Sequence, residues 1–204
     1  MSTVSNGYCT KDELKAYLSV THPDADESLT VAINAASRAI DAHCQRRFYT
    51  DTTVSARTFP VTDPYRVRVH DFSTVTGLIV ATDSGDDGTF ETTWTITTDF
   101  DCRPVNGIRG GLEGWPYFEL HAVGAKVFPL TYKRYSLSVT AKWGWASVPP
   151  MVKDACLIWA SRLYKRAASP EGIFGGFESD PIRLSARIDP DVGLLLNPYC
   201  QPVA

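Results

Sequence analysis

Residues 29–44 read LTVAINAASRAIDAHC, and this stretch decides the fold. Its apolar residues recur at intervals of three and four, which places them on one face of a helix. The alanines among them are small enough to let a partner helix pack closely against that face. The sequence therefore predicts a core helix with a buried stripe made of Leu29, Ile33, Ala36, Ile40 and Cys44.

A shorter helix precedes this core helix. Thr10 stands three residues before Glu13, which is the spacing of a capping box, in which each side chain accepts a hydrogen bond from a free backbone N–H. We expect the helix to run to about Leu18, because His22-Pro23 follows and proline cannot continue a helix.

Two further helices are predicted towards the C-terminus. Pro149 and Pro150 favour the first turn of a helix, where a missing N–H costs nothing, and Ser169-Pro170 ends that helix. Asp189, followed by Pro190, predicts the cap of a short last helix. The expected buried face of the longer of these two helices consists of Val152, Ala155, Cys156, Trp159 and Leu163.

The pattern changes between residues 51 and 142. Short segments rich in β-branched and aromatic residues are separated here by proline, glycine and aspartate, as in antiparallel sheets. They predict a small antiparallel sheet or sandwich with six strands, at residues 54–59, 66–69, 78–82, 90–96, 117–121 and 137–141.

These elements together predict an α+β fold. A bundle of three main helices, with a short C-terminal helix, carries an inserted antiparallel β-sheet or sandwich, and its terminal segments must meet in space to bury their apolar faces. The predicted organisation is a helical core of residues 1–50 and 143–168, a β domain of residues 51–142, and a C-terminal arm with a short helix at residues 169–204.

Composition limits the class of protein. The 204 residues are 44% hydrophobic and 21% charged, which is typical of a soluble globular protein. The longest apolar run, around residues 156–160, is far shorter than the roughly 18 residues that a membrane span requires. The first four residues contain no basic side chain and lead into no apolar stretch, so no secretory signal is predicted and synthesis in the cytosol is expected.

Charge is distributed unevenly along the sequence. Residues 1–102 contain 8 Lys and Arg against 15 Asp and Glu, a net charge of −7, while residues 103–204 contain 12 against 8, a net charge of +4. One interpretation is that copies of the chain associate side by side, acidic flank to basic flank; chance scatter over solvated faces explains the difference equally well. The total of −3 does not suggest a nucleic-acid-binding protein.

No pattern of catalytic or cofactor-binding residues is present. The four histidines lack zinc-site spacing, no Gly-x-Ser-x-Gly occurs, and the glycines between residues 107 and 114 match neither a dinucleotide nor a phosphate-binding loop. The five cysteines are widely separated and odd in number, which argues against a disulfide framework and for buried free thiols. We therefore predict no enzyme activity, no cofactor and no metal.

One acidic loop invites a calcium interpretation. Residues 82–89 read TDSGDDGT, and acidic side chains around a glycine turn resemble the start of an EF-hand loop. The match fails where Gly85 and Trp94 occupy ligand positions, and a hairpin turn explains Asp-Gly without a metal. The sequence thus predicts that the protein does not bind calcium in a dedicated site.

The stretch between residues 171 and 181 combines flexibility with apolar side chains. Gly172, Gly175 and Gly176 predict a flexible arm, and the arm displays Ile173, Phe174 and Phe177. Such a segment commonly becomes ordered against a partner, although a loop folded on its own core would show the same composition.

Several short motifs occur in one order along nearly the whole chain. They are Tyr8-Cys9-Thr10 with Asp12-Glu13-Leu14, residues 36–41 with Cys44 and Arg46-Arg47-Phe48-Tyr49, Trp143-Gly144-Trp145 with Pro149, Ser169-Pro170-Glu171-Gly172, Ile182-Arg183, and residues 189–192 through Pro198-Tyr199. In this order and spacing the chain resembles the head-to-tail connector (adaptor) proteins of tailed bacteriophages, in the form found in phages of actinobacteria.

The resemblance implies a structural virion protein in the phage neck, made in the host cytoplasm. About twelve copies would form a ring beneath the portal protein, extend the DNA channel, and present a lower surface to the next neck, stopper or tail protein. DNA would pass through without specific binding, because neutralising phosphates would slow its passage. Neither a cofactor nor a membrane is implied.

Contacts with the portal or a neighbouring copy are expected from the C-terminal region. The candidate residues are the apolar and basic side chains of the arm and the last helix, namely Ile173, Phe174, Phe177, Ile182, Arg183, Leu184, Leu195 and Tyr199.

Two other functions remain open from the sequence. A stopper or tail-completion protein would share the place in the virion but attach elsewhere. A calcium- or carbohydrate-binding β module would use the acidic loop at residues 83–88 and exposed tryptophans such as Trp94 and Trp115.

Overall fold

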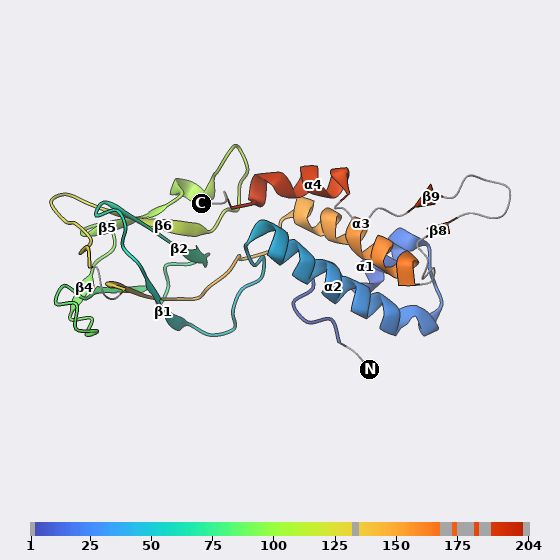
Figure 1. Ribbon diagram of the computed structural model, residues 1–204, viewed down its shortest axis with the longest axis horizontal. Coiled ribbons are helices and arrows are strands. Elements are labelled where there is room, and N and C mark those ends of the chain that lie inside the picture. Colours follow the sequence, from blue (N-terminus) through green and yellow to red (C-terminus); the bar gives the residue numbers. More distant parts are fainter. Residues whose placement is uncertain (1–2, 132–134, 168–172, 175–181, 184–188, 202–204) are drawn as a thin grey trace. The chain divides into compact units, whose positions relative to one another are not determined.

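The computed structural model describes residues 3–131, 135–167, 173–174, 182–183 and 189–201. The chain divides into two units (Figure 1): a helical unit, Met1–Arg46 with Val148–Ala204, and a β unit, Arg47–Ser147. The α+β class with an inserted antiparallel sheet is confirmed. The divisions fall at residues 46/47 and 147/148, whereas the sequence suggested 50/51 and 142/143.

Four helices form the part of the helical unit that the structure describes. The capping box predicted at Thr10 is present: its hydroxyl accepts the N–H of Glu13 at 3.2 Å, and Glu13 accepts the N–H of Thr10 at 2.8 Å. The first helix ends at Leu18 because Ser19 adopts a left-handed conformation, before the chain reaches Pro23. The helices are α1 (Lys11–Leu18), α2 (Asp26–Cys44), α3 (Pro150–Ala167) and α4 (Pro190–Leu196), with short turns η1 (Pro23–Ala25) and η3 (Asn197–Tyr199).

The predicted stripe of α2 forms the centre of this unit. All five of its residues are completely buried, and α2 packs along α3 (Figure 1). On α3 the buried positions are Val152, Ala155, Cys156, Ala160 and Ser161, while the predicted Trp159 and Leu163 are only half-buried. The small residues on both helices leave little room for larger side chains at this interface.

In its described residues, the β unit consists of seven strands in two antiparallel sheets. One sheet has the order β1-β7-β3-β4 and the other β2-β6-β5. Each turns alternate side chains inward, as Leu137, Val139 and Ala141 of β7 do, and both contribute to one apolar core. The strands are β1 (Ser55–Phe59), β2 (Arg66–Phe72), β3 (Ile79–Thr82), β4 (Thr92–Trp94), β5 (Phe100–Arg103), β6 (Tyr117–Ala122) and β7 (Leu137–Ala141).

The six predicted strands correspond to β1, β2, β3, β4, β6 and β7, and β5 is an addition. Its sequence, FDCR, alternates apolar and polar residues, which is a strand signal over only four positions. Phe100 of β5 is buried in the core that both sheets share.

A short segment after β7 closes the β unit. Residues 143–145 lie between the chain at residues 49–51 and the end of β2, since Asp51 donates its N–H to the Trp143 carbonyl at 2.7 Å and Gly144 donates to the Asp71 carbonyl at 2.6 Å. The indole N–H of Trp145 reaches the Asp71 carboxylate at 3.0 Å. The first and last residues of the β unit are thereby joined.

Candidate partner-binding surface

The structure places four of the predicted partner-binding residues on a small hairpin. Ile173–Phe174 forms β8 and Ile182–Arg183 forms β9, and the two pair antiparallel with Ile173 opposite Arg183 and Phe174 opposite Ile182. Phe177 and Leu184 lie outside the described residues. This pairing was not predicted from the glycine-rich sequence.

The other two predicted residues belong to α4 and the turn that follows it. Leu195 is half-buried, and Tyr199 is only 4% exposed, so a partner could reach little of Tyr199. Leu194, which the sequence analysis did not select, is 72% exposed. Leu196 is fully buried, and on a short helix consecutive leucines point in different directions. That geometry identifies Leu194 as the outward-facing member of the three.

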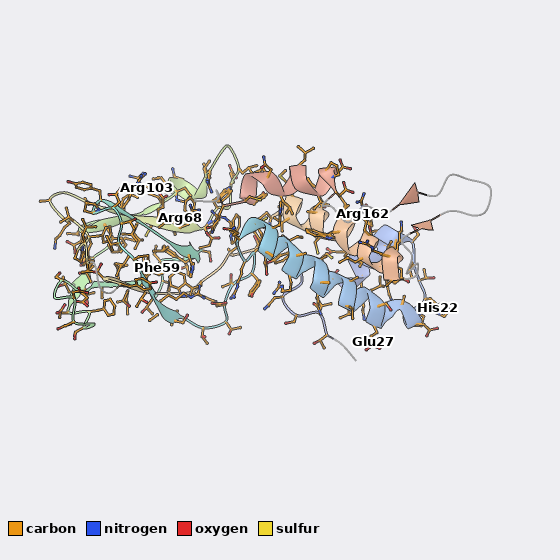
Figure 2. All side chains as sticks on the ribbon, in the orientation of Figure 1. His22, Glu27, Phe59, Arg68, Arg103 and Arg162 are labelled. Carbon is orange, nitrogen blue, oxygen red and sulfur yellow. The ribbon has the colours of Figure 1, made fainter. Side chains whose placement is uncertain are left out.

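One aspartate holds α4 in place. Asp189 accepts the N–H of Asp191 at 2.8 Å, as the predicted helix cap, and its second carboxylate oxygen forms an ion pair with Arg162 of α3. Figure 2 labels Arg162 on this helix. The Asp189 side chain is 6% exposed. Through this ion pair the cap of α4 is also joined to α3.

Replacing this cap should loosen α4. We expect Asp189→Ala to lower the free energy of unfolding by about 1–3 kcal/mol, since it removes a helix cap and a partly buried ion pair. Urea denaturation followed by circular dichroism at 222 nm measures the loss. Asp191→Ala, at an exposed position of the same helix, is the matched control and should change stability by less than about 0.5 kcal/mol. Equal losses in the two variants would contradict this role of Asp189.

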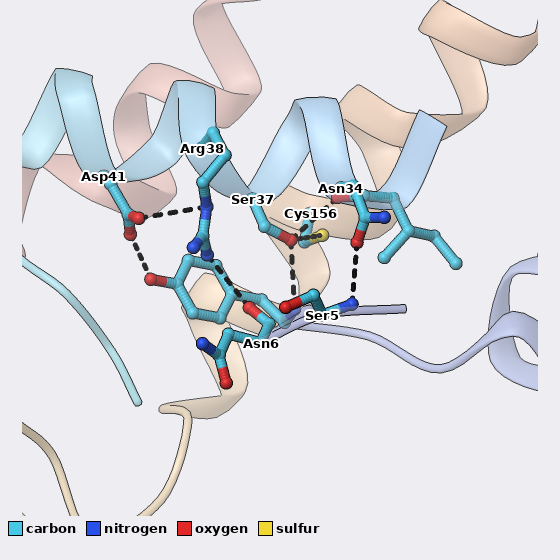
Figure 3. A network of polar contacts seen from close by, with 9 residues as sticks. Ser5, Asn6, Asn34, Ser37, Arg38, Asp41 and Cys156 are labelled. Atoms are coloured by element: carbon cyan, nitrogen blue, oxygen red, sulfur yellow. Dashed lines mark hydrogen bonds and ion pairs between the residues drawn. The ribbon is translucent and has the colours of Figure 1, made fainter. Parts of the chain in front are cut away.

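A network of polar contacts fastens the N-terminal segment along α2 (Figure 3). Ser5 donates its N–H to Asn34 at 3.1 Å, Tyr8 donates its N–H to the Ser37 hydroxyl at 3.1 Å, and Arg38 donates to the Asn6 carbonyl at 2.9 Å. The hydroxyl of Tyr8 donates to Asp41, which also forms an ion pair with Arg38 at 3.2 Å. The N-terminal segment of the same chain thus covers part of the surface of α2.

An ion pair between Glu13 and Lys153 joins α1 to α3. Lys153 of α3 contacts Glu13, and this contact, together with the hydrogen bonds from Thr10, holds the pKa of Glu13 below its ordinary value. The pKa of Lys153 is correspondingly raised. Glu13 therefore serves both the cap of α1 and the packing of α1 on α3.

The fold also brings cysteines together that are far apart in the sequence. The sulfurs of Cys9 and Cys156 lie 3.5 Å apart, and those of Cys44 and Cys200 lie 3.8 Å apart. Contact with Cys156 and burial raise the pKa of Cys9, and burial raises the pKa of Cys44. The thiols of Cys9 and Cys44 therefore stay protonated at neutral pH.

The charge difference between the sequence halves does not follow the division into two units. The helical unit contains 10 Lys and Arg against 12 Asp and Glu, a net charge of −2, and the β unit contains 10 against 11, a net charge of −1. The division at residue 102 cuts through the β unit and separates the two parts of the helical unit. The charge difference between the halves therefore does not make one unit acidic and the other basic, and side-by-side packing of an acidic and a basic flank stays a prediction.

The carbohydrate interpretation requires exposed tryptophans, and the two that it names are buried. Trp94 and Trp115 are 7% and 5% exposed, so neither indole is available to stack on a sugar. Trp94 stacks on Phe128, with ring centroids 4.5 Å apart, and Trp115 packs against Trp145. Both tryptophans are core residues.

In the described part of the chain, no helix has the length and apolar character needed to cross a membrane.

Comparison with known proteins relates the chain to phage-like particles. No protein-family model and no curated protein sequence matches it. Among the solved structures that share its fold are three chains of GTA particles. One chain in the neck of an empty GTA particle, computed with C6 symmetry, is 14% identical with a TM-score of 0.59 over all of this chain and 95% of its own. One in the neck of the native GTA particle, computed with C12 symmetry, is 14% identical with a TM-score of 0.57 over 100% and 94%.

The third is a chain of the virion of the native gene transfer agent, 18% identical with a TM-score of 0.54 over 100% and 95% of the two chains. At this level of identity the comparisons show a shared fold. From its first element to its last, the chain thus has the fold of chains found in the necks of phage-like particles.

Proposed function

We propose that the protein is a structural component of the neck of a phage or phage-like particle, where about twelve copies form a ring that joins the portal to the tail side and extends the DNA channel. The observation that carries this proposal is the likeness to neck chains over the full length of both proteins, in structures with C12 and C6 symmetry. Both symmetries belong to rings closed by repeated head-to-tail contacts.

Exposed apolar side chains of the helical unit are available for such contacts. Tyr17 of α1, Val31 of α2 and Leu194 of α4 are each more than half exposed. Burying a large apolar side chain contributes about 1.5–3 kcal/mol, so a few such residues repeated at every subunit contact would hold a ring together. The hairpin β8–β9 and the residues around it, from Ile173 to Leu184, are the proposed contact with the portal or with a neighbouring copy.

Electron microscopy of the purified protein, with and without the portal protein of the same particle, tests this function. Rings of about twelve copies, alone or on the portal, are expected. Binding only to the tail side of an assembled neck would instead indicate a stopper or tail-completion protein. The proposal would be contradicted if the protein remained monomeric in the presence of the portal protein, of necks from which this protein is missing, and of tail proteins.

The proposed contact segment is tested by a double substitution. Phe174→Ala with Phe177→Ala should leave the melting temperature of the isolated protein unchanged and lower its attachment to the portal by roughly tenfold or more, because two apolar anchors are lost. Pelleting with portal rings measures attachment. Phe90→Ala, a half-buried aromatic in the β unit, controls for a general loss of apolar surface. If the double variant unfolds the isolated protein, the two aromatics are core residues and the contact proposal is wrong.

A further inference from the structure

The connection between β3 and β4 brings three carboxylates together. One oxygen from each of Asp83, Asp87 and Glu91 lies within 4.8 Å of the other two. Two oxygens bound to the same Ca²⁺ at about 2.4 Å are at most about 4.8 Å apart, so three oxygens within this distance of one another can bind one calcium ion. Calcium also accepts irregular, partly hydrated geometry, whereas Mg²⁺ demands a near-ideal octahedron.

Asp83 supplies an independent indication of a ligand. It is completely buried at the end of β3, its N–H donates to the Ser136 carbonyl at 2.9 Å, and one carboxylate oxygen accepts the N–H of Gly88 at 2.7 Å. Its Oδ1 is also buried and has no hydrogen-bond partner among the described residues. A buried carboxylate oxygen without a partner is costly, and a cation would remove that cost.

The loop is arranged around these groups. A Cβ built at Gly85 would lie 3.6 Å from Glu91 Oε1 and 3.8 Å from Asp87 Oδ2, so both oxygens approach the same glycine. Asp86 adopts a left-handed conformation, with φ at 55°, and its Oδ1 is buried without a hydrogen bond. Within the described ranges, no lysine or arginine forms an ion pair with Asp83, Asp86 or Glu91. Their mutual repulsion favours an added cation.

We propose that the β3–β4 loop binds one Ca²⁺ through Asp83, Asp87 and Glu91. This revises the sequence-based prediction of no metal, which compared the loop with an EF-hand and rejected it at Gly85 and Trp94. The hairpin uses another ligand set: Glu91, just before β4, supplies the third carboxylate. Asp87 and Glu91 are exposed, so water can complete the six to eight oxygens that calcium takes. A dissociation constant of about 10⁻⁴ to 10⁻³ M is expected, as in extracellular modules.

Terbium luminescence of the full-length protein provides a direct test. Tb³⁺ accepts the same oxygen ligands as Ca²⁺ and emits when a nearby indole is excited. Trp94 is suitably placed, because its N–H donates to the Thr82 hydroxyl at 3.0 Å, on the residue that precedes Asp83. We expect saturable emission that Ca²⁺ displaces with the dissociation constant above and that Mg²⁺ displaces at least tenfold less well.

Matched variants decide whether these carboxylates are the ligands. Glu91→Gln should weaken Ca²⁺ binding at least tenfold, and Glu113→Gln, at an exposed glutamate in another loop of the β unit, should leave it unchanged. Isothermal titration calorimetry checks the same affinities without the indole. Absence of saturation below about 10 mM Ca²⁺, equal effects of the two variants, or equal displacement by Mg²⁺ would each overturn the proposal.

Discussion

Replacing Gly144 by alanine is expected to unfold the β unit. Gly144 has φ at 107°, a conformation that alanine rarely adopts, and it donates its N–H to Asp71. An added Cβ would collide with the Tyr49 carbonyl oxygen, and it would lie 2.8 Å from the Tyr49 carbonyl carbon and 3.0 Å from the Thr50 Cα. These are backbone atoms, so no side-chain rotation can relieve the collision. We expect a loss of more than about 4 kcal/mol, measured by urea denaturation followed by tryptophan fluorescence.

The chain offers a control that separates backbone strain from collision. Gly124 also has a positive φ, 65°, but a Cβ there would meet nothing within 4 Å. Gly124→Ala should therefore cost only about 1–2 kcal/mol, the penalty of a left-handed conformation. Fluorescence is informative because four of the five tryptophans lie in the β unit. Equal losses of unfolding free energy in the two variants would show that the close approach of residues 49–50 to Gly144 adds nothing to the cost of the substitution.

Trp145→Ala is expected to have the second largest effect, about 3–5 kcal/mol. The indole is almost completely buried, and it packs against Phe48 and Trp115 with ring centroids 5.1 and 5.0 Å away. Its N–H donates to the buried carboxylate of Asp71 at 3.0 Å. The substitution therefore removes a large apolar contact and leaves Asp71 with one donor fewer. Denaturation followed at 222 nm measures the loss without depending on this fluorophore.

Trp145→Phe divides that effect into two parts. Phenylalanine keeps most of the ring contacts and loses the N–H, so it should cost about 1.5–3 kcal/mol, the range for a hydrogen bond to a charged group. Trp159→Phe makes the same replacement at a half-buried position of α3 and should cost less than about 1 kcal/mol. If Trp145→Phe proved as mild as Trp159→Phe, the bond to Asp71 would not contribute to stability.

Local patterns in the sequence predicted most of the elements. The stripe from Leu29 to Cys44 is buried as expected, because helical periodicity reports directly on which face is apolar. The cap at Thr10 could be predicted because a capping box is complete within four residues. The strand β5 was missed because four residues of alternation carry little information.

Contacts between distant residues could not be predicted in this way. Tyr199 follows a short helix and is a predicted partner-binding residue, but only 4% of it is exposed. The three carboxylates of the β3–β4 loop fit no known spacing, and only the turn of the backbone brings Glu91 to Asp87. Nothing local to Cys9 indicates that Cys156 will lie 3.5 Å away. Each of these positions depends on how elements pack, which single-sequence periodicity does not report.

The split helical unit has a consequence for synthesis on the ribosome. The β unit is one continuous stretch, so it can fold as soon as Ser147 has emerged. The stripe of α2 ends at Cys44, whereas α3, which covers it, begins at Pro150, roughly 100 residues later. At about 5–20 residues per second, the nascent chain displays that stripe uncovered for about 5–20 s. Throughout this interval α2 is a target for chaperones and for other nascent chains, and the domain synthesised in the middle of the polypeptide can mature before the one that begins it.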